Sequence, residues 1–152
     1  MAASSQIVRP WHIAPLLMLL ALIIFPFEWL GMRWHALGWF ITHAFPSDTQ
    51  HAIGHATLFA LLGGLALATF PSLRTQPRRY VLLVLAGVAQ EAAQLLFKQR
   101  PLASDDGRDL AVDAVGLALA WLGYALFAER QAKAATSLLD QSIAQLEPSK
   151  VA

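Results

Sequence analysis

The sequence contains no cysteine, and only 14% of its 152 residues are charged. The absence of cysteine excludes a disulfide, a thiolate nucleophile and a cysteine metal site, and it leaves the redox compartment undetermined. A serine-nucleophile motif, a glycine-rich phosphate loop and a dinucleotide-binding fingerprint are absent as well. The net charge is only +1 and the basic residues fall in short clusters, so nucleic acid is excluded as a partner.

The chain is instead rich in apolar residues. They make up 57% of the sequence, and the mean hydropathy is +0.50, which is too apolar for a fully solvated surface. Four segments approach the roughly 20 apolar residues that cross about 30 Å of hydrocarbon. They are residues 11–32, 51–70, 80–97 and 110–128. We therefore predict an all-α, polytopic integral membrane protein with about four transmembrane helices.

The first predicted span begins like a signal peptide, because Arg9 precedes an apolar run. Large residues, Phe25 to Trp29, follow where a small-residue cleavage site would lie, so we expect the segment to be retained. Pro26 lacks a backbone donor and is expected to kink or end this helix. Residues 33–46 combine tryptophan, phenylalanine and histidine as in the headgroup zone, which predicts a short interfacial helix between the first and second spans.

The basic residues predict the orientation. The connection 71–79 carries three arginines and no acid, and by the positive-inside tendency it is cytoplasmic. Both termini are then cytoplasmic as well. The predicted parts are a cytoplasmic N-terminus (1–10), a transmembrane domain (11–128) and a polar tail (129–152). The tail is expected to form a weak amphipathic helix or to fray.

The third predicted span carries a charged residue on a defined face. Gly87, Glu91 and Gln94 recur at spacings of four and three residues, which places them on one face of a helix. A carboxylate inside a bilayer is costly unless it is paired, protonated or in contact with water. Glu91 therefore needs a partner.

Candidate partners lie at the start of two other spans. The fourth span begins with Asp109 and Asp113, and the second begins with His51 and His55. The helix face of Asp113 continues with small residues, namely Gly116, Ala120 and Gly123. Small residues let a neighbouring helix approach closely, which places Asp113 against another helix. In the predicted topology these groups meet Glu91 in one polar cluster near the outer surface.

These residues form an ordered set of motifs. They are His55, the run Glu91-Ala92-Ala93-Gln94, Arg100, the pair Asp109-Leu110 and Gly116. The set resembles the VanZ-like membrane protein family, whose pattern is a histidine early in one span, an E-x-x-Q helix, an arginine after a short turn and a D-L-x-x-N-x-x-G helix start. The resemblance implies a protein of the bacterial inner membrane and a link to low-level teicoplanin resistance. The biochemical activity of the family is not established.

The chain departs from the family pattern in the charges near the site. His51 and Ala52 stand where the family usually has an Asp-Lys pair, and Asp113 replaces the family asparagine. The segment from Arg100 to Asp109 is also a few residues longer than usual. The first two departures change the charge balance of the predicted site and with it the ligand that the site is able to bind.

From these residues we predict a polar pocket that opens to the extracytoplasmic face and recognises an anionic lipid-linked or peptidoglycan-related headgroup. Glu91 and His55 are the candidate catalytic residues, as a proton-exchanging pair in which either serves as general base. The candidate ligand-binding residues are Arg100, Gln94, Asp109 and Asp113. In this hypothesis Arg100 contacts phosphate or carboxylate, Gln94 orients the ligand, and the two aspartates hold Arg100. A membrane lipid or envelope precursor is the predicted partner, with no cofactor.

Plainer interpretations stay open for several residues. Glu91 can form a buried pair that only holds helices together. For His55, a hydrogen bond to Glu91 or Asp113 is the favoured use. Residues 105–108 are expected to form a solvated turn, with one acid capping the fourth helix.

A metal site is the other alternative for the histidines. His51 and His55, four residues apart, could ligate one metal with Asp109 or Asp113. The glutamate of an HExxH motif is missing, and His51 has no counterpart in the family pattern. The sequence analysis therefore predicts no metal.

Two further classes of function remain. In a small transporter or proton relay, Glu91 would exchange access between the two surfaces, although the cytoplasmic halves of the spans carry almost no ionisable residues. In a structural subunit of an envelope complex, the polar cluster would serve assembly alone. Binding and catalysis both stay open, so the sequence does not establish an enzyme.

Overall fold

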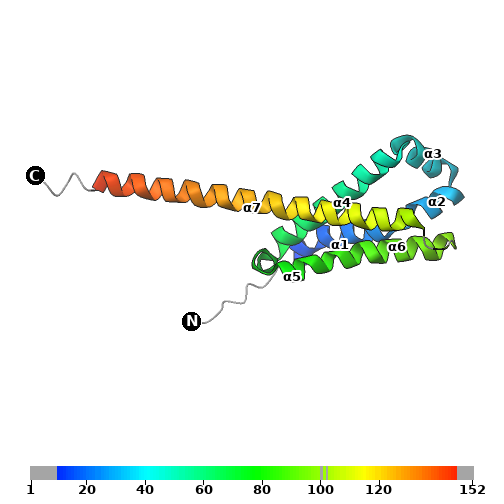
Figure 1. Ribbon diagram of the computed structural model, residues 1–152, viewed down its shortest axis with the longest axis horizontal. Coiled ribbons are helices and arrows are strands. Elements are labelled where there is room, and N and C mark those ends of the chain that lie inside the picture. The colour runs from blue at the N-terminus through cyan, green and yellow to red at the C-terminus, as the bar shows by residue number, and fades with distance from the viewer. Residues whose placement is uncertain (1–9, 100, 102, 147–152) are drawn as a thin grey trace, which may run out of the picture. The chain divides into compact units, whose positions relative to one another are not determined.

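A computed structural model of the chain describes residues 10–99, 101 and 103–146. The regular structure of these residues is entirely helical, which confirms the predicted all-α class (Figure 1). The α-helices are α1 (Pro10–Ile24), α2 (Phe27–Arg33), α3 (His35–Ala44), α4 (Asp48–Thr69), α5 (Pro77–Tyr80), α6 (Val84–Lys98) and α7 (Ser104–Leu146). The 3₁₀ helices are η1 (Pro71–Thr75) and η2 (Val81–Leu83).

The chain divides into two units, one ending at Trp121 and one beginning at Leu122. The first unit contains α1 to α6 and the first part of α7. In the second unit, the described residues continue α7 as far as Leu146. This part of the predicted polar tail is therefore helical and does not fray.

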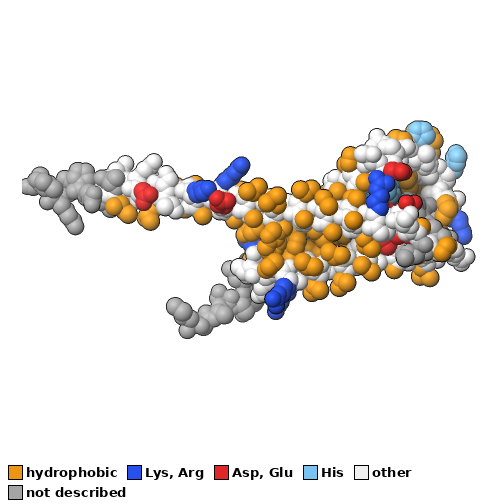
Figure 2. Space-filling model, in the orientation of Figure 1, with side chains coloured by type: hydrophobic (Ala, Val, Ile, Leu, Met, Phe, Trp, Pro, Cys, Tyr) orange, Lys and Arg blue, Asp and Glu red, His pale blue; other side chains and the backbone are white. Residues whose placement is uncertain are grey.

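Three helical segments of the described residues are long and apolar enough to cross a membrane. They are Asp48–Thr69, Pro77–Phe97 and Ser104–Ile143. Large apolar side chains on these segments point outward, and Leu61, Leu85 and Leu119 are each more than half exposed. Figure 2 shows hydrophobic side chains over the visible face of the first unit, between two ends that carry charged side chains. Such a surface indicates a membrane-embedded protein.

The first predicted span, residues 11–32, is interrupted. α1 ends at Ile24 and α2 begins at Phe27, with Pro26 between them. This confirms the predicted effect of Pro26, whose ring has no N–H to continue the helical hydrogen bonds. The apolar part of α1, Ile13–Ile24, is shorter than the three long segments. A fourth membrane crossing in this part of the chain remains a prediction.

The short helix predicted within residues 33–46 is α3. It packs against α2 where two glycines meet, because a Cβ on Gly38 would collide with the carbonyl oxygen of Gly31. Glycine is needed for this close approach of two backbones. The location of α3 in the headgroup zone remains a prediction.

The core of the first unit is centred on α4. Its almost fully buried side chains are Phe59, Leu62 and Leu67. Gly63 on the same helix leaves room for the Tyr80 hydroxyl and for Leu117 of α7. α4 is thus packed directly against α7 and the start of the Pro77–Phe97 segment.

Tyr80 provides a specific link to α7. Its hydroxyl donates to the carbonyl oxygen of Leu117 over 2.7 Å, and its ring centroid lies 5.0 Å from that of Trp121. We expect Tyr80→Phe to lower the free energy of unfolding by about 1 kcal/mol, the value of one buried hydrogen bond, because the ring contact is kept. SDS titration of the purified protein in mixed micelles measures this change. Tyr80→Leu, which also removes the ring, should lose more, and an unchanged stability of Tyr80→Phe would contradict the role of the hydroxyl.

The last long helix of the described residues extends beyond the predicted span. α7 starts at Ser104, whereas the predicted span starts at residue 110. Asp106 Oδ2 accepts a hydrogen bond from the backbone N–H of Ala103 over 2.7 Å, and acids in the first turn favour a helix N-terminus. The predicted capping acid is confirmed. The predicted solvated turn is wrong for Asp106, which is 1% exposed.

Candidate functional site

A buried histidine–aspartate pair joins α4 to α7. His55 Nδ1 lies 3.0 Å from Asp113 Oδ1, and the two side chains are 8% and 0% exposed. A carboxylate only accepts hydrogen bonds, so Nδ1 carries the hydrogen and donates it. Of the two partners predicted for His55, the structure therefore confirms Asp113.

Asp113 also packs against α6. A Cβ on Gly87 would lie 2.8 Å from Asp113 Oδ2, so a larger residue there would displace the carboxylate. Oδ2 is buried and has no hydrogen-bond partner among the described residues. The face of α6 that carries Gly87 therefore meets the acidic face of α7, and α4, α6 and α7 converge on one side chain.

Glu91 belongs to the same cluster. It is 4% exposed, and its Oε1 has no hydrogen-bond partner within the described part of the chain. Its carboxyl group interacts electrostatically with Asp109 and His55. Among the described residues, the hydrogen bond of His55 Nδ1 goes to Asp113 and not to Glu91. The predicted proton-exchanging pair of Glu91 and His55 stays a prediction.

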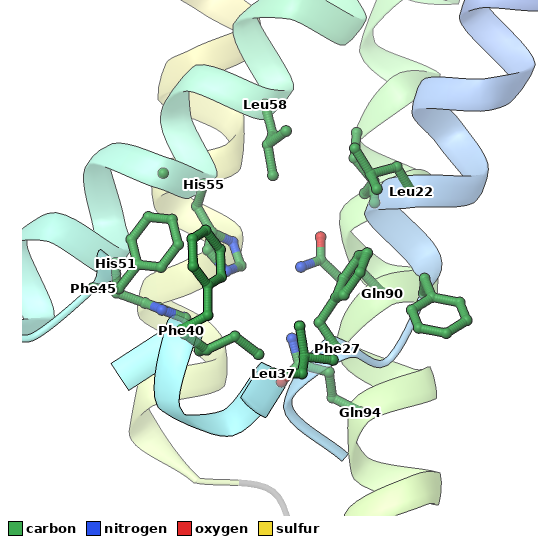
Figure 3. A pocket seen from close by; sticks show the side chains of 14 residues that line it. Leu22, Phe27, Leu37, Phe40, Phe45, His51, His55, Leu58, Gln90 and Gln94 are labelled. Atoms are coloured by element: carbon green, nitrogen blue, oxygen red, sulfur yellow. The ribbon is translucent and has the colours of Figure 1, made fainter. Parts of the chain in front are cut away.

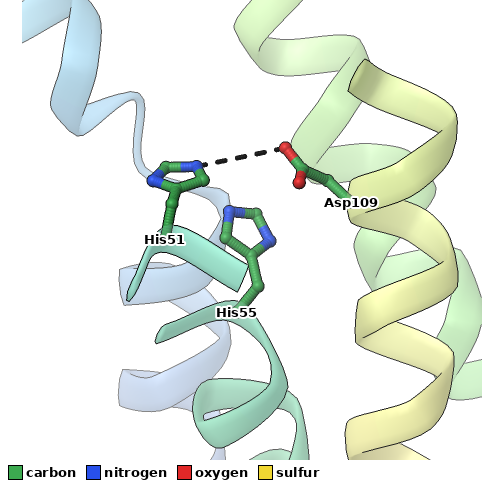
Figure 4. Close-up of side chains that lie close together, drawn as sticks. All are labelled: His51, His55 and Asp109. Carbon is green, nitrogen blue, oxygen red and sulfur yellow. Dashed lines mark ion pairs between the residues drawn. The ribbon is translucent and has the colours of Figure 1, made fainter. Parts of the chain in front are cut away.

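His51 and Asp109 form the more exposed edge of the cluster. His51 Nε2 lies 4.0 Å from Asp109 Oδ2, and the side chains are 34% and 21% exposed. The ring centroids of His51 and His55 lie 4.8 Å apart. Figure 4 shows the side chains of His51, His55 and Asp109 facing one space between α4 and α7. One ligating atom from each of the three lies within 4.8 Å of the others.

A cavity of about 370 Å³ lies beside the two histidines (Figure 3). Apolar residues form most of its wall, among them Leu22, Phe27, Leu37, Phe40, Phe45 and Leu58. Its polar lining residues are His51, His55, Gln90 and Gln94. In Figure 3 the amide of Gln90 points from α6 toward His55 on α4. The cavity therefore combines an apolar wall with a polar side.

Gln90 is a site residue that the sequence analysis missed. It is 8% exposed, and its Oε1 has no hydrogen-bond partner among the residues described. Gln94, which was predicted to bind ligand, lines the same cavity. The two glutamines are four residues apart on one helix face, and this spacing is the signal that identifies Gln90. Gln90 was missed because the sequence-based prediction of site residues considered only the helix face that carries Glu91.

The remaining predicted site residue, Arg100, lies outside the described residues. Its predicted contacts with a ligand and with Asp109 and Asp113 therefore stay predictions. The structure brings together the other five predicted residues, which are His55, Glu91, Gln94, Asp109 and Asp113, around α4, α6 and the start of α7.

The described part of the cluster contains more acids than bases. Its carboxylates are Glu91, Asp106, Asp109 and Asp113, and its imidazoles are His51 and His55. Buried carboxylates repel one another and are costly in a membrane unless cations, protons or water offset them. The arrangement therefore favours an additional positive charge at the site.

Comparison of the chain with protein-family models, with curated proteins and with solved structures finds no match. The resemblance to the VanZ-like family stays a prediction that rests on the motifs alone.

Proposed function

We propose that the chain is a VanZ-like protein of the bacterial inner membrane that binds an anionic lipid-linked or peptidoglycan-related molecule in this cavity. The observation that carries the proposal is a cavity of about 370 Å³ with an apolar wall and a polar side, inside a membrane-embedded unit. Small-molecule sites are typically of this size, with few polar groups that orient the ligand. The apolar wall suits a lipid chain, and the polar side suits its headgroup.

The amides on the polar side supply hydrogen-bond donors for a headgroup. Gln90 and Gln94 each carry two N–H donors, and both line the cavity. The carboxylates of the cluster repel an anion, so the proposal needs a cation beside the ligand. Arg100 is the proposed cation, because a guanidinium binds phosphate or carboxylate through two parallel hydrogen bonds.

The proposed orientation has both termini in the cytoplasm and the cavity open to the extracytoplasmic side. Its support is the connection 71–79, which carries three arginines and no acid. Arg74, Arg78 and Arg79 belong to η1 and α5, which lie at the end of this unit opposite to α2 and α3 (Figure 1). By the positive-inside tendency this end, where no acid of the connection offsets the arginines, faces the cytoplasm, whereas Arg108 at the opposite end is paired with Asp48. The resemblance extends the proposal to an influence on teicoplanin susceptibility.

Binding and catalysis place different demands on the histidine. A binding site needs no proton transfer at all. A catalytic version uses Glu91 or His55 as general base. For His55, the hydrogen bond to Asp113 orients the ring and leaves Nε2 as the nitrogen that accepts a proton.

Native mass spectrometry of the detergent-purified protein tests the proposal. We expect the wild type to retain one polyprenyl-phosphate or related precursor of defined mass. Leu58→Trp places a larger side chain in the cavity wall and should abolish retention, as should Arg100→Ala. Leu61→Trp is the matched control, because Leu61 lies on the same helix but is 53% exposed, outside the cavity. This control should retain the lipid at the level of the wild type.

Generic phospholipid bound equally by all four proteins would contradict the proposal. That result would favour one of two other functions. One is a proton relay, which the buried carboxyls of Glu91 and Asp113 support, and the other is a role in assembly. An assembly role predicts that cluster variants lower abundance and activity together. A ligand site predicts that Arg100→Ala loses the lipid while the protein remains abundant.

A further inference from the structure

Three potential metal ligands come together from two helices at the edge of the cluster. His51 and His55 lie one turn apart on α4, and Asp109 belongs to the second turn of α7. Their ligating atoms lie within 4.8 Å of one another, and His51 Nε2 is 4.0 Å from Asp109 Oδ2. Around a tetrahedral Zn²⁺ with bonds of about 2.0–2.1 Å, neighbouring ligand atoms lie about 3.3 Å apart. A contraction on the order of 1 Å therefore closes the set around an ion.

The two outer ligands are able to make this adjustment. The side chains of His51 and Asp109 are 34% and 21% exposed, so they have room to change rotamer. His51 lies in the first turn of α4 and Asp109 near the start of α7, away from the tightly packed centre of the unit. His55, in contrast, is buried and held in place.

Asp113 prepares His55 for a metal. Histidine ligands in metal sites usually donate their second ring N–H to a carboxylate, which fixes the tautomer and the orientation of the ring. His55 Nδ1 makes this bond to Asp113 Oδ1 over 3.0 Å, and both side chains are buried. Nε2 is then the nitrogen with a lone pair available to an ion. Figure 4 shows the ring of His55 beside the space between His51 and Asp109.

The charges of the cluster also favour a bound cation. Besides Asp109, the carboxylates of Glu91, Asp106 and Asp113 act on this region. A divalent ion offsets several of these charges at once. Histidine nitrogen and carboxylate oxygen are both ligands that zinc accepts.

We infer that His51, His55 and Asp109 bind one Zn²⁺ ion, with Asp113 as the positioning residue behind His55. This departs from the metal-free site that the sequence predicts. The missing HExxH glutamate and the absence of His51 from the family pattern argued against a metal, but the structure brings the ligating atoms of His51, His55 and Asp109 within 4.8 Å of one another. Here the third ligand comes from α7. With three protein ligands, a tetrahedral ion keeps one position for water or another ligand.

The location of the ion gives the cavity a second source of positive charge. His51 and His55 both line the cavity, so an ion that they hold lies on its polar side. The open coordination position then suits a phosphate or carboxylate oxygen. This step alone rests on the proposed function, and zinc binding itself does not.

Zinc binding by the full chain in detergent tests the inference. The purified protein is stripped with EDTA, dialysed against ZnCl₂ and measured by elemental mass spectrometry, with affinity from competition against a chromophoric chelator. We expect one zinc per chain in the wild type. His51→Ala and Asp109→Asn should weaken binding at least about tenfold. Asp113→Asn keeps an oxygen that accepts from His55 but loses the charge, and it should weaken binding by about 10–100-fold.

His35→Ala is the matched control, because His35 is an exposed histidine on α3 outside the cluster. It should bind zinc as the wild type does. A wild type that binds no zinc, or a His51→Ala variant with wild-type affinity, overturns the inference. An equal loss in His35→Ala overturns it as well, since zinc would then bind surface histidines. Zinc is the only ligand added, so zinc binding without lipid retention separates this inference from the proposed function.

Discussion

Asp113→Ala is expected to lower the free energy of unfolding by about 3–5 kcal/mol, the range found when one partner of a buried pair is removed. Its side chain is 0% exposed, and without it His55 Nδ1 loses its acceptor in a buried site. The substitution also leaves a space against Gly87, which has no side chain to fill it. SDS titration in mixed micelles measures the loss.

Two control variants separate the causes of this loss. Asp113→Asn preserves the volume and an oxygen that accepts from His55, so we expect less than half of the destabilisation of the alanine variant. Asp140→Ala removes an exposed acid from the same helix and should stay within about 0.5 kcal/mol of the wild type. If Asp113→Ala were as stable as Asp140→Ala, the pair would not hold α4 and α7 together.

Gly116→Ala is expected to destabilise the protein by about 1–3 kcal/mol, although alanine favours a helix over glycine by about 1 kcal/mol. The new Cβ would collide with the carbonyl oxygen of Ala56, and the carbonyl carbon of Ala56 would lie 3.0 Å away. A backbone group of a buried helix cannot move aside as a flexible side chain can. α7 must therefore shift away from α4, which also stretches the His55–Asp113 hydrogen bond.

Gly123→Ala is the matched control for this effect. Gly123 lies two turns further along α7, and nothing lies within 4 Å of the Cβ that alanine would add. The same substitution should there stabilise the protein by up to about 1 kcal/mol, through helix propensity alone. Opposite signs at the two positions, measured by the same SDS titration, are the expected result. Equal effects would show that Gly116 is not a contact residue.

The contact between α4 and α7 could be predicted from the spacing of residues, because Asp113 and His55 each follow a simple packing rule. Asp113 shares a helix face with Gly116, and small residues permit close helix packing in a membrane. His55 lies in the apolar second span, where a buried ring needs a polar partner. The prediction was correct for Gly116, which packs on Ala56. A stripe of small residues indicates a face, and the partner helix determines how much of that face is used.

Hydropathy locates the apolar part of α7 and not its start, because it measures preference for lipid and not helix formation. The residues before Leu110 are polar, yet they are helical, since Asp106 satisfies a backbone donor at the helix start. Hydropathy also merged α1 and α2 into one span, where Pro26 separates them. The cavity was beyond prediction from the sequence, because its wall combines α1, α2, α3, α4 and α6, whose packing depends on contacts distant along the chain.

Because three helices converge on Asp113, their packing depends on the order in which the chain is synthesised. Translation places His55 and Glu91 in the nascent chain before Asp113 exists. A chain still lacking α7 therefore carries His55 without the acceptor of its ring N–H, and an uncovered Ala56 carbonyl. The contacts that Asp113 makes with α4 and α6 form only once α7 is present. The polar cluster thus makes synthesis of α7 a condition for the packing of α4, and a product truncated before Asp113 would leave His55 without its buried acceptor.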